Sequence, residues 1–100
     1  MLVTLRIRPD RDEDFRRALH DVLGPARSEP ACLDLRVHEA HDEPGTYYLL
    51  ESWRDVTEYL GEILRKPYYC RYLEISEATY ASPRTVVRLN PLFPSSDLGA

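Results

Sequence analysis

The stretch CLDLRVHEAHDEPGTYYLLESW, residues 32–53, contains two segments of alternating polarity separated by turn-forming residues. Its first eight residues alternate leucine and valine with charged or imidazole side chains, which is the period of a β-strand. Its last eight residues, rich in tyrosine and leucine, form a second candidate strand, and HDEPGT supplies the loop between them. The stretch therefore predicts a β-hairpin.

The second strand of this hairpin carries large apolar groups at both its odd-numbered and its even-numbered positions. Successive side chains of a strand point to opposite faces of the sheet. One face then holds Tyr47, Leu49 and Trp53, whereas the other holds Tyr48 and Leu50. Because both sets are large and apolar, we expect both faces of this strand to be covered.

The chain before the hairpin predicts a strand and a helix. Residues 2–8 alternate between apolar and polar side chains, as a half-buried strand does. Asp10 with Glu13 resembles a capping box, so an amphipathic helix is expected to begin there. The Gly-Pro pair at 24–25 predicts a kink or a restart, because proline lacks an amide donor, and the Glu-Pro pair at 29–30 predicts the end.

The chain after the hairpin predicts two further helical stretches and a fourth strand. Asp55 with Glu58 begins a helix by the same capping logic, and an apolar stripe follows at helical spacing. Pro67 breaks that helix and opens a second stretch that runs to about Ala78. Residues 85–89, TVVRL, then predict a short strand.

The order β, α, β, β, α, β predicts an α+β fold of the ferredoxin-like, split β-α-β type. Its four-stranded antiparallel sheet would have helices on one face only. The open face would then expose the apolar groups of the hairpin, and a second copy of the chain is the simplest cover. We expect one domain over residues 1–91 and an extended or loosely held tail over residues 92–100.

Composition narrows the class of protein. The chain has 100 residues and a net charge of −4 with interspersed signs, which argues against nucleic acid as a partner. No apolar run approaches the roughly 18 residues of a membrane span, and no export signal is present. We therefore expect a cytoplasmic protein without a membrane partner. Cys32 and Cys70 are expected to be reduced and mostly buried.

The sequence lacks the common motifs of several enzyme classes. It contains no G-x-S-x-G elbow, no phosphate-binding glycine loop and no Cys-His pairing, which argues against hydrolase, nucleotide-dependent and thiol mechanisms. His38 and His41 have no third ligand at a suitable spacing, so no metal site is expected.

Glu51 is the candidate catalytic residue. A carboxylate among large apolar strand residues is partly desolvated, which raises its pKa toward that of a useful general base. The structural alternative is an ion pair with Arg36 or Arg88. Trp53 is the only tryptophan, and its indole either stacks on a planar substrate or packs in the core or the dimer interface.

Tyrosines supply the other candidate substrate-binding residues. In the helix opened by PYYCRY, Tyr68 and Tyr72 are four apart and share one face, whereas Tyr69 shares a face with Leu73. We assign Tyr69 and Leu73 to the core, and Tyr68 and Tyr72 to the edge of a pocket, where a phenol can donate a hydrogen bond to a substrate oxygen. Tyr48 of the hairpin is a further candidate.

These features together resemble the antibiotic biosynthesis monooxygenase (ABM) family, also called dimeric α/β barrels. The resemblance rests on RPDRDEDF (8–15), SEPACLDLRVHEAHDEPGTYYLLESWRD (28–55) and KPYYCRY (66–72), and it extends over residues 2–91. It implies a homodimer whose sheets pack face to face, with a pocket in each subunit between sheet and helices. It also implies no cofactor, because most members of known activity oxidise electron-rich aromatic or quinol substrates without metal or flavin.

The expected function follows with one alternative. The chain resembles a cofactor-independent monooxygenase of a small planar aromatic or quinol-like molecule, in which Glu51 assists proton removal, Tyr68 and Tyr72 hold the ring and Trp53 forms an apolar wall. Many relatives, however, carry histidine at the positions of Tyr68 and Ile63. The alternative is therefore a non-catalytic dimeric domain that binds a small ligand.

Overall fold

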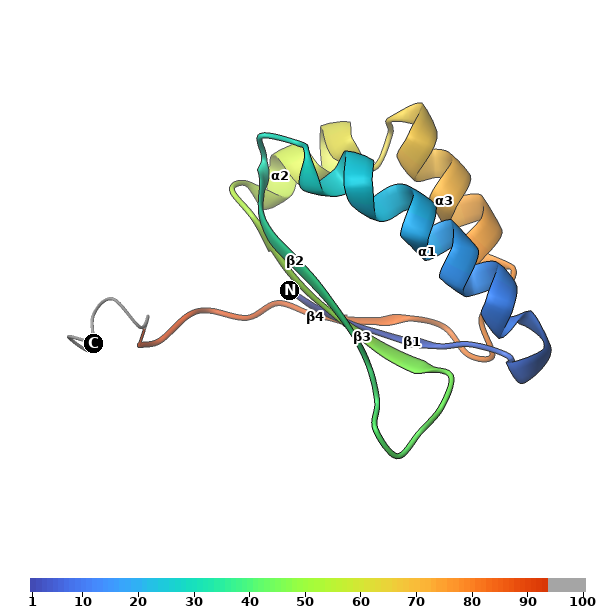
Figure 1. Cartoon of the computed structure of the whole chain (residues 1–100). Helices are drawn as coiled ribbons and strands as arrows, with labels where there is room; N and C mark the ends of the chain where they lie inside the picture. Colours follow the sequence, from blue (N-terminus) through green and yellow to red (C-terminus); the bar gives the residue numbers. More distant parts are fainter. Residues whose placement is uncertain (94–100) are drawn as a thin grey trace.

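The computed structural model describes residues 1–93 and contains one four-stranded antiparallel sheet with helices over one face (Figure 1). The strands lie in the order β2-β3-β1-β4. This arrangement confirms the predicted α+β, ferredoxin-like fold. The elements in chain order are β1 (Leu2–Arg6), the 3-10 turn η1 (Pro9–Arg11), α1 (Asp12–Arg27), β2 (Cys32–Glu39), β3 (Thr46–Trp53), α2 (Val56–Glu58), the π-helical turn η2 (Tyr59–Ile63), α3 (Pro67–Glu77) and β4 (Thr85–Val87).

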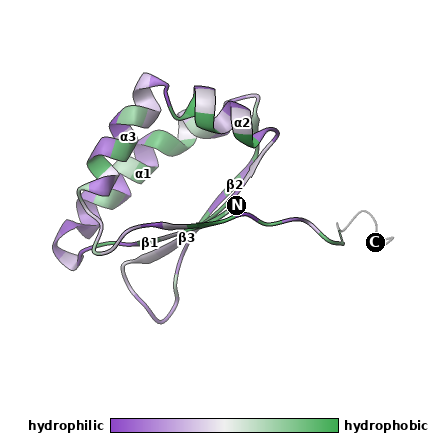
Figure 2. Cartoon of the chain, turned by 180° about the vertical axis from the view of Figure 1, so that it is seen from behind, coloured by the Kyte–Doolittle hydropathy of each residue, from purple (hydrophilic) through white to green (hydrophobic). Residues whose placement is uncertain are grey.

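The core lies between the sheet and the helix layer. α1 and α3 run side by side over the sheet (Figure 1), and hydrophilic and hydrophobic residues alternate around both helices (Figure 2). Phe15 of α1 is fully buried, and its ring centroid lies 4.8 Å from that of Tyr47 on β3. The helix-facing set of β3 predicted from its parity is buried, whereas Leu50 on the opposite face is 39% exposed.

The predicted capping box at the first helix is wrong. Asp10 belongs to the η1 turn, and α1 begins at Asp12 without a side-chain cap. Its acidic first turn makes tertiary contacts instead, because the Asp12 carboxylate accepts hydrogen bonds from Tyr47 Oη and from Arg16 Nε. The negative charge near the helix N-terminus still interacts favourably with the positive end of the helix dipole.

The predicted restart of the helix at Gly24-Pro25 is also wrong, because α1 continues through Pro25 to Arg27. Pro25 sits in the last turn, so its missing amide removes one bond, to the carbonyl of the exposed Asp21, where water can replace it. Ser28 then closes the helix, since its amide and its hydroxyl both donate to the carbonyl of Gly24.

The second half of the chain follows the predicted order with a different helix geometry. Asp55 accepts hydrogen bonds from the amides of Thr57 (2.8 Å) and Glu58 (3.4 Å), which confirms it as an N-cap. The helix widens into a π turn after one turn, with the amide of Leu64 donating to the carbonyl of Tyr59. α3 begins at Pro67 as predicted.

Three smaller expectations need correction or fall outside the structure. The fourth strand is shorter than predicted and ends at Val87. Both cysteines are free as expected, but Cys32 is only half-buried and Cys70 is exposed, because Cys70 falls on the outer side of α3. Most of the predicted tail, residues 94–100, lies outside the described residues. Within the part of the chain that is described, no helix has the length and apolar character to cross a membrane.

Candidate functional site

Glu51 lies on the helix-facing side of β3 and is only 3% exposed. The indole Nε1 of Trp53 donates a hydrogen bond to Glu51 Oε1 at 2.9 Å. Within residues 1–93 the Glu51 side chain forms no ion pair, and Arg36 pairs with Asp34 instead, at 2.8 Å. The carboxyl group is therefore buried beside an aromatic donor, without the ion pair considered as its alternative role.

Burial raises the pKa of Glu51 above its ordinary value, because the ionised form loses its hydration. The hydrogen bond from Trp53 opposes this shift, and so do the positive charges of the terminal amino group and of Arg84. Burial is the larger effect. A carboxylate with a raised pKa is a stronger base than an exposed one, which suits proton abstraction near neutral pH.

Aromatic side chains surround Glu51 on the helix side. The Trp53 and Tyr59 rings are stacked, with centroids 4.5 Å apart and an interplanar angle of 28°. The Tyr59 and Tyr69 hydroxyls share a hydrogen bond of 3.0 Å. The Tyr69 ring meets the Tyr72 ring edge-on, at 5.8 Å and 88°. These flat groups form one continuous aromatic cluster next to the carboxyl group.

Tyr59 is the residue of this cluster that the sequence did not single out. The amphipathic pattern assigned it only to the apolar stripe of a regular helix. The signal that could have found it is geometric, since π-helical turns are rare and occur frequently at functional sites. The wide turn directs Tyr59 onto Trp53 and Tyr69 together.

The structure brings only some of the predicted site residues together. Trp53 touches Glu51, and Tyr72 is buried and reaches the cluster through Tyr69. Tyr68 is half-buried at the edge of the helix layer. Tyr48 lies on the opposite face of the sheet, cross-strand from Thr4 and His38, and does not join them.

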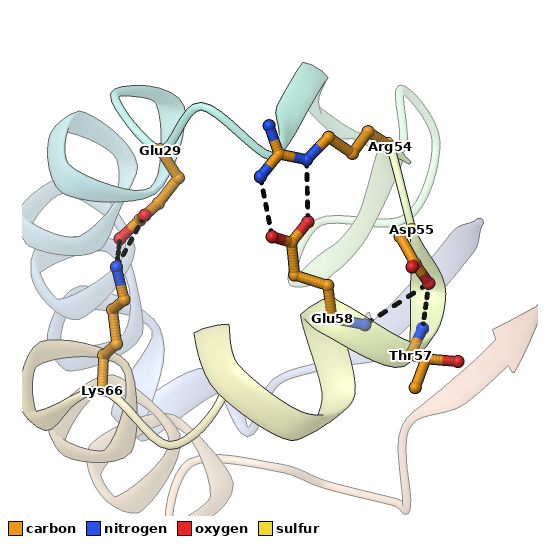
Figure 3. Close-up of polar contacts among 6 residues, drawn as sticks. All are labelled: Glu29, Arg54, Asp55, Thr57, Glu58 and Lys66. Atoms are coloured by element: carbon orange, nitrogen blue, oxygen red, sulfur yellow. Dashed lines mark hydrogen bonds and ion pairs between the residues drawn. The ribbon is translucent and has the colours of Figure 1, made fainter.

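Tyr68 is tied to a cluster of charged groups at the start of α3. Its hydroxyl donates to Glu29 Oε1 at 2.8 Å, and Lys66 Nζ donates to both oxygens of Glu29, at 2.8 and 2.7 Å. The hydrogen bond from Lys66 is the main reason why the pKa of Glu29 lies below its ordinary value. Glu29 follows the C-terminus of α1, so this cluster joins that end of α1 to the start of α3 (Figure 3).

A second set of polar contacts holds the segment that carries Tyr59. Arg54 makes a two-pronged ion pair with Glu58, at 2.9 and 2.7 Å, and the carboxylate of Asp55 caps the helix beside it (Figure 3). The Arg54–Glu58 pair is solvent-accessible, so it contributes little to stability by itself. The shared effect of the ion pair and the cap is to orient the short α2–η2 segment that places Tyr59 against Trp53.

A hollow of about 460 Å³ opens beside Glu51, at the end of the sheet where β1 begins and β4 ends. Its walls combine apolar and polar groups: Met1, Leu33, Glu51, Ser52, Trp53, Val56, Arg88, Leu89, Asn90 and Pro91. A volume of this size lies within the range of small-molecule sites. Among the described residues no three His, Cys, Asp or Glu side chains are grouped so that they could hold a metal ion.

The buried carboxyl predicts a specific pH dependence of stability. Because burial raises the folded-state pKa of Glu51, the folded chain holds this proton more tightly than the unfolded chain does. The stabilisation that this proton gives the folded state is full below the unfolded-state pKa of about 4.3. It is lost as pH rises through the raised pKa of the folded state. We therefore expect the melting temperature of Glu51→Gln, relative to wild type, to rise between pH 4 and neutral pH. A constant difference across that range would contradict the assignment, and Glu62→Gln controls for net charge.

Comparison with known proteins places these features in a wider group. The sequence model described as antibiotic biosynthesis monooxygenase matches residues 1–62. An uncharacterized protein from Synechocystis sp. is 27% identical over 82 residues, which make up 82% of this chain. The match spans 55% of the length of that relative, so this chain corresponds to about half of it.

Solved structures show the same architecture over nearly the whole chain. A protein from Mycobacterium tuberculosis is 27% identical with a TM-score of 0.80, and the match covers 91% of each chain. A protein from Nitrosomonas europaea, described by the same family name, has a TM-score of 0.83 at 18% identity, with 92% of this chain and 96% of that chain covered. At this identity, the similarity to the Nitrosomonas europaea protein shows a shared fold alone.

Proposed function

Because the chain belongs to the antibiotic biosynthesis monooxygenase family, we propose that it is a cofactor-independent monooxygenase of a small planar aromatic or quinol-like substrate. The observation that carries this proposal is the buried carboxyl group of Glu51, which has a raised pKa, an indole donor and an adjoining hollow. Residues 1–91 form the single catalytic domain in this proposal.

The proposed reaction uses the substrate as the reductant. Ionised Glu51 accepts a proton from an acidic ring CH2, and the resulting carbanion gives its electrons to O2 and forms a C–O bond. The peroxide anion takes a proton from the Glu51 carboxyl group to become a hydroperoxide. Loss of water then leaves a ring carbonyl, so that the CH2 group and O2 become C=O and H2O. Atoms and electrons balance without a further reductant.

The aromatic cluster supports binding of a flat substrate. Trp53 lines the hollow and offers an apolar face on which a ring can stack, and the stacked ring of Tyr59 supports its indole from within the core. In this proposal Tyr72 backs the cluster through Tyr69, and Tyr68 is held by Glu29; neither residue lines the hollow beside Glu51.

Oxygen uptake by the purified protein tests the proposal. We expect uptake with at least one member of a panel of quinols and anthrone-like phenols, in the absence of added metal or flavin. Uptake should match the formation of one carbonyl product per O2. If no compound supports uptake while some of them raise the melting temperature, the protein is instead a ligand-binding member of the family.

We also propose that the chain forms a homodimer through the open face of its sheet. That face carries no helix (Figure 1) and exposes apolar side chains of one cross-strand row, with Leu50 39% and Val87 51% exposed. Tyr48 lies among them, half-buried between Thr4 and His38. A second copy related by a two-fold axis would cover all of these groups at once.

Leu50→Lys is expected to separate the proposed dimer. Two-fold symmetry brings two such lysines into one interface, where desolvated like charges oppose association. The dimer dissociation constant should rise by about a hundredfold or more, as measured by light scattering after size-exclusion chromatography. Leu60→Lys is the matched control, because Leu60 is 49% exposed on η2 in the helix layer. A monomeric wild type, or an equal effect of both variants, would contradict this proposal.

A further inference from the structure

Arg88 lies in the same cross-strand row as Glu51. Leu2 pairs with Leu50 on one side and with Val87 on the other, so the next row contains positions 51, 1 and 88. The amide of Glu51 donates to the carbonyl of Met1 at 2.9 Å, which continues the ladder into this row. Two strand spacings, about 10 Å, separate the backbones of Glu51 and Arg88.

Both ends of this row border the hollow beside Glu51. The lining of the hollow includes Glu51 and Arg88 from the two ends of this row, and Trp53 and Val56 add apolar groups. Ser52 and Asn90 add polar groups. A hollow lined by one arginine and by apolar groups suits a flat molecule that carries an acidic group.

Arg88 is free to bind such a group. Its side chain is exposed, and within residues 1–93 it makes no hydrogen bond or ion pair. The Nε and Nη2 atoms of Arg54, in contrast, both donate hydrogen bonds to the carboxylate of Glu58. The planar guanidinium presents paired N–H donors that match the two oxygens of a carboxylate.

A second cation acts in the same direction. The positive charge of Arg84, which precedes β4, opposes the rise that burial causes in the pKa values of Glu51 and Tyr59. Arg84 and Arg88 thus bracket the edge strand with positive charge. Among the described residues, the only acidic side chain on the wall of the hollow is the buried Glu51.

We propose that the ligand of this hollow is an aromatic carboxylate whose carboxylate group is bound by Arg88. Its ring lies along Trp53, and the far edge of the ring faces Glu51. The proposed function names a planar aromatic or quinol-like substrate, and this assignment specifies that the molecule also carries a carboxylate. Only the placement of the reacting edge rests on that function, since binding of the carboxylate does not require turnover.

A matched pair of ligands tests the assignment by isothermal titration calorimetry. 2,5-Dihydroxybenzoate and 2,5-dihydroxybenzamide have the same ring and differ in the charge of one substituent. We expect wild type to bind the carboxylate about tenfold or more tightly than the amide. The fluorescence of Trp53, the only tryptophan, gives a second readout because its indole lines the hollow.

Arg88→Gln is expected to remove the preference for the carboxylate and to leave binding of the amide nearly unchanged. Arg88→Lys should restore part of the preference, since it retains the charge but not the planar fork. Arg17→Gln is the control, because it removes the charge of another exposed arginine, on α1 away from the hollow.

The outcomes separate this inference from the proposed oxygenase activity. Equal binding of carboxylate and amide, no binding of either compound, or an unchanged preference in Arg88→Gln overturns the role of Arg88, whatever the oxygen uptake. A clear preference that depends on Arg88, together with no oxygen uptake from any compound, upholds the ligand class and contradicts the monooxygenase proposal. Melting curves establish that each variant is folded.

Discussion

Replacing Tyr69 with alanine is expected to lower the free energy of unfolding by about 3–5 kcal/mol, the usual cost of deleting a large buried aromatic side chain. Tyr69 is 6% exposed and lies at the centre of the aromatic cluster. Its ring meets the rings of Tyr59 and Tyr72 edge-on, with centroids 6.1 and 5.8 Å away. Alanine would leave a cavity and would also leave the Tyr59 hydroxyl without its partner.

Tyr68→Phe is the matched control for this substitution. It keeps the ring and removes only the hydroxyl that donates to Glu29, which retains both contacts from Lys66. We expect a loss of about 1 kcal/mol. Urea denaturation of both variants and wild type measures the two values. Similar losses would show that Tyr69 does not have the central packing role assigned to it.

The hairpin could be predicted from the sequence to the residue. Its two strands occupy residues 32–39 and 46–53, as the alternation of side chains predicted. Period-two patterning is informative here because one side of each strand faces a core, so a slip by one residue would reverse every side chain. The order of elements and the fold class followed from this hairpin and its flanking helices.

Local rules failed where tertiary contacts or position in the helix outweighed them. Pro25 was expected to break α1, but a proline in the last turn costs a single hydrogen bond at an exposed carbonyl. The expected capping box at Asp10 and Glu13 did not form, because the chain inserts a 3-10 turn before the helix. Neither outcome is visible in a pattern of residue types.

The candidate site could be predicted in part. The burial of Glu51 followed from its apolar neighbours, and the structure places it as expected beside Trp53. Tyr48 could have been separated from them by parity, since residues 48 and 51 differ by an odd number and point to opposite faces. The contact of Tyr59 with Trp53 depends on the π turn, which no sequence pattern predicted.

Replacing Glu51 with glutamine is expected to lower kcat/KM for oxygen uptake by about a hundredfold to ten-thousandfold, the usual contribution of a general base. Glutamine has nearly the same shape and keeps an oxygen that can accept the hydrogen bond from Trp53. The aromatic cluster should therefore remain in place, and binding of a substrate analogue should change little. The loss would then lie in proton removal rather than in substrate binding.

The pH profile of wild type gives an independent check on the role of Glu51. A base must be ionised to act, so kcat/KM should fall as pH decreases through the pKa of Glu51, which burial raises above that of an ordinary carboxyl group. The fall should therefore occur at a higher pH than it would for an exposed glutamate. The residual kcat/KM of Glu51→Gln should not show this fall as pH decreases.

Two other variants separate catalysis from general effects on the site. Glu62→Gln removes an exposed carboxylate from η2 and should leave kcat/KM unchanged. Tyr59→Phe removes the hydroxyl next to Tyr69 but not the ring that stacks on Trp53, and should have a much smaller effect than Glu51→Gln. If Glu51→Gln retains wild-type kcat/KM with an unchanged acidic limb, another group removes the proton, and the raised pKa of Glu51 reflects burial in the core alone.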